Sequence, residues 1–296
     1  MKILMCIPNI SEGRNREVVE QVAAEIRAVT GVKLLDYSSD ADHNRSVLTY
    51  LGESEPVLAA TQAMALKALE LIDMTRHQGA HPRLGVVDVV PFVPLQGIET
   101  AEAVELARRF GRFLGEQGVP VYYYEDAATR PERVNLADIR RGQYEGLPDK
   151  LKDPAWTPDE GPAVFNPQAG ATVTGARFPL IAFNVNLRTA DVKIAKKIAQ
   201  RIRHSSGGFR YVKAMGVDLA EQGLAQVSMN LTNYTKTPLP VVLETIRAEA
   251  ARYGVAVAGT ELIGTMPMAA LEEVIQYYLQ MHDFKLNQIV EYDLLE

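Results

Sequence analysis

The sequence predicts an α+β protein built from two ferredoxin-like subdomains, each with the element order β-α-β-β-α-β, whose sheets face a central cleft. Two observations support this prediction. Short apolar runs recur between amphipathic helical segments, and the same order occurs before and after a proline-rich stretch at about residues 126–177. The 296 residues are enough for two domains of ordinary size, which we place at residues 1–178 and 179–296.

In the first half, strands and helices are expected to alternate from the N-terminus. The spacing of Val18, Val22 and Ile26 indicates one buried helical face, and Gly31 follows as a terminator. β-branched and aromatic residues mark the strands. The expected strands are 2–8, 32–37, 45–51 and 85–91, and the expected helices are 15–29 and 56–72. A helix over 100–117 and a strand over 119–124 extend this subdomain.

The second half repeats the order. Thr189 is the expected N-cap of its first helix, and Pro238 suits the first turn of its second. The expected strands are 179–185, 211–217, 224–231 and 255–260, and the expected helices are 189–204 and 238–253. The stretch between the halves is either a surface excursion or a substrate-binding segment, and its residues leave both interpretations open.

Composition excludes several classes of protein. A net charge of −6 argues against a non-specific nucleic-acid surface. No window reaches the roughly 18 apolar residues of a membrane helix, and the apolar run 3–7 is too short for a signal peptide. The single cysteine, Cys6, excludes a disulfide within the chain, fits a reducing compartment and is expected to be a buried strand residue.

Two histidines stand in the loop DMTRHQGAHPRLG, where glycine and proline disfavour regular structure. They are His77 and His81, and Arg76 and Arg83 flank them. Polar loops at strand ends often carry binding and catalytic groups, and arginine binds carboxylates in bidentate fashion. The loop is therefore either a site for anionic ligands or a pair of structural histidines.

A metal site is the alternative for this loop. His77 and His81 have the spacing of two ligands on a helix, and Asp40, Asp42 or His43 could complete a mixed set. The string HQGAH, however, lacks the glutamate of HExxH, and glycine weakens a helix. We therefore expect no metal.

Three further segments are polar or rich in glycine. Residues 8–17 precede the first helix, where backbone amides bind anions or Ser11 or Asn15 caps the helix. Residues 38–47 join two strands, and their aspartates could orient an imidazole or merely form a solvated turn. Residues 161–177 contain glycines, prolines and Phe165, which suit either a flat ligand or a plain surface loop.

Taken together, these segments resemble the formiminotransferase family. The resemblance extends from Pro8 to at least Leu231. Its most specific part is the long histidine motif. The segments that carry it are PNISEGRN, HNRSV, DMTRHQGAHPRLGVVDVVPFVP, GPAVFNPQAGATVTGAR, FPLIAFNVNL and LAQVSMNL.

The resemblance implies a function. The family transfers a formimidoyl group from N-formimidoyl-L-glutamate to N5 of tetrahydrofolate, a co-substrate, in histidine degradation and one-carbon metabolism. It also implies a cytoplasmic homodimer with folate in the cleft between the subdomains. Because no cyclodeaminase domain follows, that second activity is expected to be absent. Transfer of a formyl group from N-formylglutamate and a non-enzymatic small-molecule-binding module remain alternatives, although the histidine loop disfavours the module.

The resemblance also assigns residues. The histidine in the HPR context, His81, is implied as the catalytic proton carrier. Its aspartate partner stays open among Asp36, Asp40 and Asp42, because Ser38 stands where the family has aspartate. Other candidates for substrate binding are Asn9, Asn44, Arg45, Arg76 and Arg83. The implied folate-binding segment is Gly161, Pro162, Ala163, Val164, Phe165, Asn166, Pro167, Gln168, Ala169 and Gly170. A Gly170→Val variant is expected to weaken folate binding and leave the fold intact.

Overall fold

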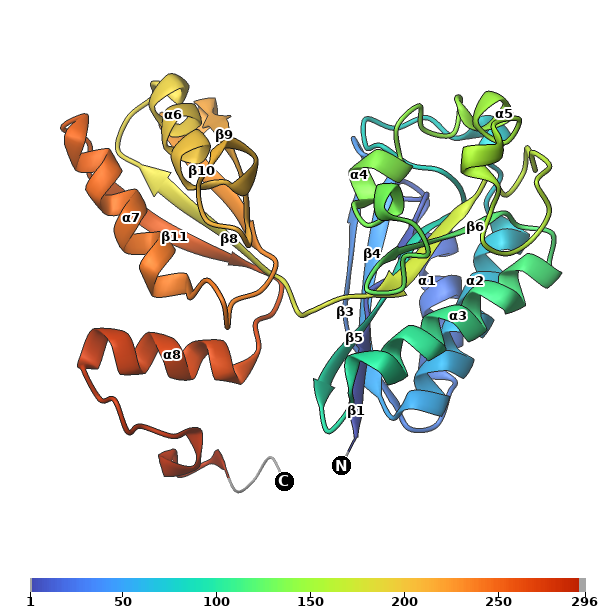
Figure 1. Cartoon of the computed structure of the whole chain (residues 1–296), viewed down its shortest axis with the longest axis horizontal. Coiled ribbons are helices and arrows are strands. Elements are labelled where there is room, and N and C mark those ends of the chain that lie inside the picture. Colours follow the sequence, from blue (N-terminus) through green and yellow to red (C-terminus); the bar gives the residue numbers. More distant parts are fainter. Residues whose placement is uncertain (1, 293–296) are drawn as a thin grey trace. The chain divides into compact units, whose positions relative to one another are not determined.

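Two sheets organise residues 2–292, the part of the chain that this computed structural model describes (Figure 1). The chain divides into unit 1, Met1–Arg177, and unit 2, Phe178–Glu296. The boundary predicted between residues 178 and 179 lies next to this division. Both units contain the order β-α-β-β-α-β, which confirms the predicted α+β fold class with ferredoxin-like subdomains. The cleft expected between the two sheets stays a prediction.

The sheet of unit 1 is an extended ferredoxin-like sheet. Strand β3 pairs with β4, β4 with β1 and β2, and these with β5, while β7 and β6 extend the far edge. The strands are β1 (Ile3–Cys6), β2 (Asn9–Ile10), β3 (Val32–Asp40), β4 (Arg45–Gly52), β5 (Val87–Gln96), β6 (Val121–Glu125) and β7 (Thr172–Ala176). The helices are α1 (Arg16–Arg27), α2 (Ser54–Leu71), α3 (Thr100–Glu116), α4 (Leu136–Ile139) and α5 (Leu147–Lys150).

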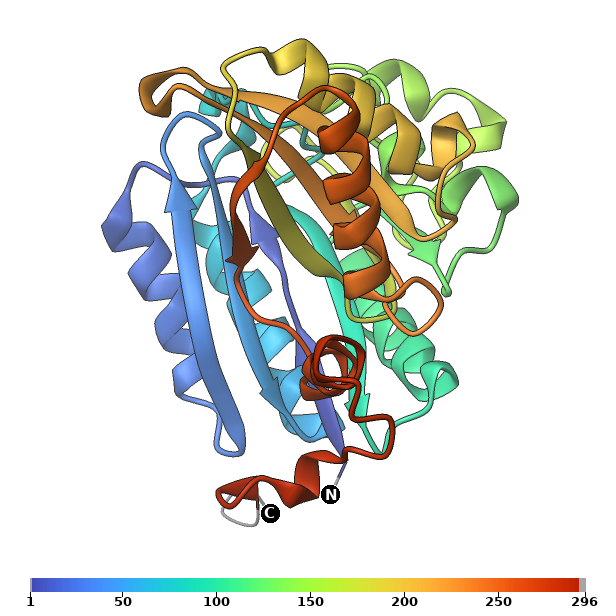
Figure 2. The same ribbon diagram turned by 90° about the vertical axis from the view of Figure 1, so that its left-hand side faces the viewer.

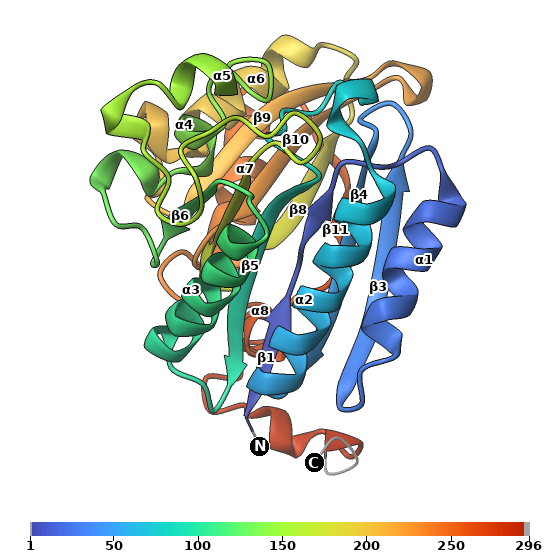
Figure 3. The ribbon, with the colours of Figure 1, turned by 90° about the vertical axis from the view of Figure 1, so that its right-hand side faces the viewer.

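Helices α1, α2 and α3 lie over one face of this sheet (Figure 3). The apolar stripe of α1 is buried there, including Val22 and Ile26. Asn15 caps α1, since its side chain accepts hydrogen bonds from the backbone N–H groups of Glu17 and Val18. Capping is thus one role of the polar segment 8–17.

Strand β7 was predicted as a loop, and that prediction is wrong. All five residues of Thr172–Ala176 are buried, and the strand pairs in parallel with both β5 and β6. A strand buried on both faces shows no alternation, and its glycine and small residues read as a loop. The Thr174 hydroxyl donates to the Val90 carbonyl at 2.9 Å, which satisfies its polar group inside the sheet.

The stretch between the halves is folded onto unit 1 around a buried ion pair. Arg133 is 1% exposed and donates to Asp159 at 2.8 Å, to the Thr157 carbonyl at 2.7 Å and to the Ala155 carbonyl at 3.0 Å. The guanidinium also lies over the rings of Tyr122 and Trp156. This part of the stretch is therefore packed on unit 1, and a substrate-binding role of the stretch stays a prediction.

Unit 2 has the strand order β11-β8-β10-β9, with α6 and α7 over one face of the sheet (Figure 2). The α6 cap differs from the prediction: Asp191, not Thr189, accepts from the Lys193 N–H. Helix α8 was not predicted. The elements are β8 (Ile181–Leu187), α6 (Val192–Ile202), β9 (Val212–Leu219), β10 (Leu224–Leu231), α7 (Leu239–Arg252), β11 (Val257–Ile263) and α8 (Met268–Leu279).

Composition led to expectations about Cys6 and about membrane-spanning helices. Cys6 is fully buried in β1 next to the Thr61 hydroxyl, and burial raises the pKa of its thiol to about 11. This confirms Cys6 as a buried strand residue. Within residues 2–292, none of the helices combines the length and the apolar character that crossing a bilayer requires.

The buried ion pair gives a test of the fold. Arg133→Met is expected to lower the free energy of unfolding by about 3–5 kcal/mol, because it leaves the Asp159 carboxylate buried without its partner. Arg130→Met is the matched control: Arg130 donates to the same Ala155 carbonyl from an exposed position, and its loss should cost less than about 0.5 kcal/mol. Urea denaturation measures both, and equal losses would contradict this account.

Candidate active site

Asn44 joins three of the four segments that the sequence singled out. Its side-chain oxygen accepts from the Gly13 N–H at 3.0 Å, and its side-chain nitrogen donates to the Gln78 carbonyl at 3.0 Å. Its own carbonyl accepts from His77 Nε2 at 2.8 Å. The backbone of Asn44 has a positive φ of 48°, which asparagine tolerates better than most residues. Segments 8–17, 38–47 and 74–83 are therefore held as one cluster.

The histidine loop approaches the turn before β4 so closely that only glycine fits at position 79. A Cβ on Gly79 would lie 2.2 Å from the His43 carbonyl oxygen. The next residue, Ala80, donates its N–H to the Asp42 carbonyl at 3.1 Å. This close contact between two backbones places His81 next to Arg45, the first residue of β4.

His81 is partly buried and faces a guanidinium. Its Nε2 lies 2.7 Å from Nη1 of Arg45, and its Nδ1 is buried without a hydrogen-bond partner. Because arginine remains protonated and only donates, Nε2 is the accepting nitrogen and the neutral ring carries its proton on Nδ1. Burial, followed by the charges of Arg45, Arg140 and His43, lowers the pKa of His81 to about 4. The imidazole is therefore neutral at neutral pH.

One of the three candidate aspartates, Asp40, pairs with a different histidine. Asp40 Oδ2 lies 2.7 Å from Nδ1 of His43, and its other oxygen accepts from the N–H groups of His43 and Asp42. These hydrogen bonds lower the pKa of Asp40. The His43 ring stands edge-on to His81 with centroids 5.9 Å apart. Among the described residues, His81 has no carboxylate as a hydrogen-bond partner.

Arg140, which follows α4, is the site residue that the sequence did not reveal. It donates to Asp88, a β5 carboxylate that is 1% exposed and also accepts from the Leu84 N–H at 2.8 Å. Burial raises the pKa of Asp88, and Arg140 counteracts that shift. The aspartate inside the apolar run GVVDVVP was the available signal, because a buried carboxylate requires a cation.

Arg83 and His77 hold the histidine loop in place through hydrogen bonds. Arg83 is 7% exposed and makes a bidentate pair with Glu145 at 2.6 and 2.9 Å. Its Nε donates to His77 Nδ1 at 3.3 Å, so both ring nitrogens of His77 are engaged. Burial lowers the pKa of His77. These contacts fit structural roles for both residues better than binding of a substrate.

Two other substrate-binding candidates lie apart from this cluster of contacts. The Arg76 side chain is 88% exposed, with its Nε 3.8 Å from Asp73. The Asn9 side chain donates to the carbonyl of Ile7 at 3.2 Å. Neither contact joins its residue to His81.

The predicted folate-binding segment is ordered and tied to the start of the histidine loop. The Gln168 carbonyl accepts from the Met74 N–H at 3.0 Å, and Tyr144 donates to the Pro167 carbonyl at 2.6 Å. Phe165 packs against the Tyr144 ring with centroids 5.4 Å apart. Val164 is 67% exposed, so the segment offers an apolar side chain to solvent.

Gly170 is part of the fold of this segment. Its φ is +70°, and a Cβ there would lie 2.2 Å from the Leu84 carbonyl oxygen. A valine would force the backbone apart, so the expectation that Gly170→Val leaves the fold intact is wrong.

The geometry gives no support to the metal alternative. His77 and His81 engage different partners, the Asn44 carbonyl and Arg45. Within residues 2–292, no group of three or more histidine, cysteine, aspartate or glutamate side chains is arranged to hold a metal ion.

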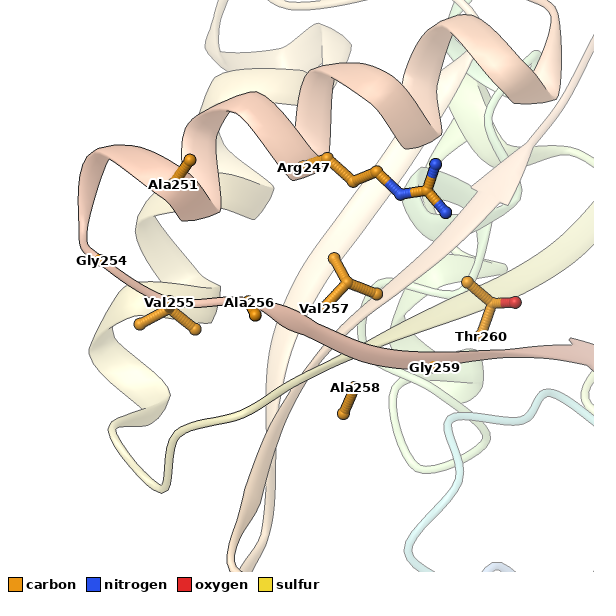
Figure 4. A pocket seen from close by; sticks show the side chains of 9 residues that line it. All are labelled: Arg247, Ala251, Gly254, Val255, Ala256, Val257, Ala258, Gly259 and Thr260. Carbon is orange, nitrogen blue, oxygen red and sulfur yellow. The ribbon is translucent and has the colours of Figure 1, made fainter. Parts of the chain in front are cut away.

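An open hollow in unit 2 lies beside the end of α7 and the start of β11 (Figure 4). Arg247 is the charged side chain that lines it, and Glu244 already pairs with that guanidinium. The hollow is lined by Arg247, Ala251, Gly254, Val255, Ala256, Val257, Ala258, Gly259 and Thr260. These residues include no histidine and no other proton carrier.

Comparisons with known proteins agree with the resemblance found in the sequence. Residues 3–177 match the family described as formiminotransferase domain, N-terminal subdomain, and residues 182–293 match the family described as formiminotransferase domain. A glutamate formimidoyltransferase of Streptococcus pyogenes is 51% identical, with 99% of each chain covered. One of Thermoplasma acidophilum is 46% identical, with 98% of this chain and 97% of that protein covered.

Longer relatives also match. A formimidoyltransferase-cyclodeaminase of Gallus gallus is 43% identical, and the match covers 94% of this chain and 53% of that protein. Family matches over nearly the whole length and these identities lead to one conclusion: the chain belongs to the formiminotransferase family.

Proposed function

We propose that this chain transfers the formimidoyl group of N-formimidoyl-L-glutamate to N5 of tetrahydrofolate, which yields 5-formimidoyltetrahydrofolate and L-glutamate. The relatives named above as glutamate formimidoyltransferases support the substrates. The observation that carries the mechanism is a neutral, partly buried His81 beside two arginines. Incubation of the purified protein with tetrahydrofolate and either N-formimidoyl- or N-formyl-L-glutamate tests it. We expect the absorbance of the product to appear when the formimidoyl donor is used.

In the proposed mechanism, N5 attacks the formimidoyl carbon and a tetrahedral intermediate forms. The attacking nitrogen loses a proton and the leaving glutamate nitrogen gains one. His81 is neutral in the free protein, so once its Nε2 faces the substrate it can accept the first proton and return it to the leaving nitrogen. No covalent intermediate with the protein is needed. Holding both substrates in attack geometry contributes several kcal/mol more, on the order of what the proton transfers supply.

The substrates carry carboxylates, and arginines are the groups that bind them. Arg45 lies at His81, Arg140 acts on the same imidazole, and Arg76 is exposed. We assign the glutamate carboxylates to this set. Asn44 and Arg83 hold the loops in place, and Asn9 remains a candidate for substrate binding. The segment Gly161–Gly170 is the proposed folate site, supported by its link to the histidine loop through Met74.

Three features follow from the family resemblance alone. The homodimer, the cytoplasmic location and the role in histidine degradation stay predictions.

Replacement of His81 tests the proton carrier. His81→Ala is expected to lower kcat by roughly 10²–10⁴-fold, the usual contribution of a general acid–base. Folate binding should change much less, because the imidazole acts mainly in the transition state. Steady-state kinetics and a folate titration measure the two effects.

Two histidines serve as controls for this variant. His204→Ala, at an exposed position in unit 2, should leave kcat unchanged. His77→Ala removes the hydrogen bond to Asn44, so it should lower thermal stability together with activity. If His77→Ala abolishes turnover at full stability while His81→Ala retains it, the roles of the two histidines must be exchanged.

Substitution of Val164 tests the folate segment. Val164→Asp should raise the dissociation constant for tetrahydrofolate by about tenfold, since it removes about 1.4 kcal/mol of apolar contact and adds a charge that repels the folate carboxylates. The melting temperature should not change, because the side chain is exposed. Val134→Asp, also exposed in unit 1, is the control. Equal affinity in both variants would remove Val164 from the site.

Chelation tests the expectation that the reaction needs no metal. Activity should be fully retained after exhaustive dialysis against a chelator, because the proposed steps need only proton transfers and charge pairing. Loss of activity that one equivalent of a divalent ion restores would overturn this expectation.

A further inference from the structure

The nitrogen that His81 needs for proton transfer is occupied. Its Nδ1 is buried near the backbone of Pro82, so Nε2 is the ring nitrogen available to a substrate. The lone pair of Nε2, however, accepts from Nη1 of Arg45 at 2.7 Å. A base whose lone pair is engaged by a permanent donor cannot accept another proton. In this arrangement His81 is inactive.

Arg45 itself lacks a carboxylate partner among the described residues. Its Nε is buried without a hydrogen bond, as is the Nε of Arg140. Asp88, the buried carboxylate nearby, already pairs with Arg140. Arg140 thus has a buried carboxylate partner and Arg45 has none, and unpaired donors in a buried setting are costly. A ligand carboxylate would complete the site by accepting from Arg45 in bidentate fashion.

We propose that Arg45 blocks His81 in the free protein and that a substrate carboxylate draws the guanidinium away, which frees Nε2 to accept a proton. The inference rests on the proposed function. The carboxylate belongs either to the glutamyl donor or to the glutamyl tail of folate. Arg45 is thus a positioning residue that couples binding to chemistry, because proton transfer begins only when the substrate occupies the site.

The groups around His81 fix the direction of the effect. Arg45 from β4, Arg140 from the segment after α4 and His43 from the preceding turn all act together with burial to lower the pKa of His81. The negative charges of Asp88 and Asp40 raise the pKa of Arg45 and so favour its charged form. A carboxylate that pairs with Arg45 offsets one of these positive charges, so the pKa of His81 should rise when the carboxylate binds.

Titration of His81 followed by NMR, with ¹³C-labelled histidine, tests the proposal. The midpoint should lie near 4 in the free protein and rise by about one unit or more with saturating L-glutamate. A rise with tetrahydrofolate but not with tetrahydropteroate, which lacks the glutamyl tail, would place the carboxylate on folate instead. An unchanged midpoint with all three ligands at saturation overturns the proposal.

Variants separate Arg45 from a general effect of ligand binding. Arg45→Gln should raise the His81 midpoint in the free protein and abolish its response to the carboxylate. Arg14→Gln is the matched control, because Arg14 donates to the Ala41 carbonyl in the same turn and its loss should leave the titration unchanged. If Arg45→Gln responds to L-glutamate as the wild type does, Arg45 is not the blocking group. Should that variant fail to fold, the wild-type ligand titration still decides.

Kinetics give a second readout. The kcat/KM profile reports the free enzyme and should fall as pH drops through about 4, where His81 becomes protonated. The kcat profile reports the complex, in which the pKa of His81 is raised, so its acid limb should lie at higher pH than that of the kcat/KM profile. If the enzyme is active, but the acid limbs of the two pH profiles coincide and the pKa of His81 does not change when a ligand binds, the proposed role of Arg45 is wrong and the proposed reaction stands. If the pKa of His81 rises when a carboxylate binds but the protein shows no transferase activity, the proposed reaction is wrong and the role of Arg45 stands.

Discussion

The candidate site depends on the hydrogen bonds of one buried asparagine. Asn44 binds Gly13 and Gln78 through its side chain and His77 through its carbonyl, so one residue holds three segments that are far apart in the sequence. Each of these groups would otherwise be an unpaired polar atom away from water, which is unfavourable. The position of His81 is therefore fixed largely by residues that we do not expect to touch a substrate.

Electrostatics give that arrangement its chemical character. Arg45 and Arg140 bring two positive charges toward one imidazole, and the buried Asp88 balances one of them. Arg45 and Arg140 each keep a buried Nε without a hydrogen-bond partner, next to a histidine that can carry a proton. Such local conflicts are typical of functional sites, where a ligand supplies the missing partner.

Periodic patterns allowed most of the fold to be predicted from the sequence. The alternation in β4 and β10 and the apolar stripe of α1 are local signals, and each reports a single buried face. Strand β7 lies between two parallel strands and has no exposed face, so it leaves no alternation to detect. The α6 cap was misplaced because both Thr189 and Asp191 are good caps.

The candidate site was harder to predict than the fold. Loop composition brought His77, His81, Arg83 and Arg45 into view, yet the sequence could not tell a structural arginine from one that meets a ligand. Burial and partners make that distinction: Arg83 is saturated by Glu145 and His77, whereas Arg45 is not. Arg140 stands in no recognisable motif, and only the folded chain brings it to Asp88.

The late position of β7 in the sequence has a consequence for synthesis of the chain. Strands β5 and β6 both pair with β7, which is made some fifty residues after β6 begins. Until the ribosome has released residues 172–176, two strands carry unpaired N–H and C=O groups along the edges that β7 later fills. Exposed edges of this kind recruit other chains, and long-range parallel pairing forms slowly. A nascent chain that stalls before residue 172 should therefore be prone to aggregate or to need a chaperone.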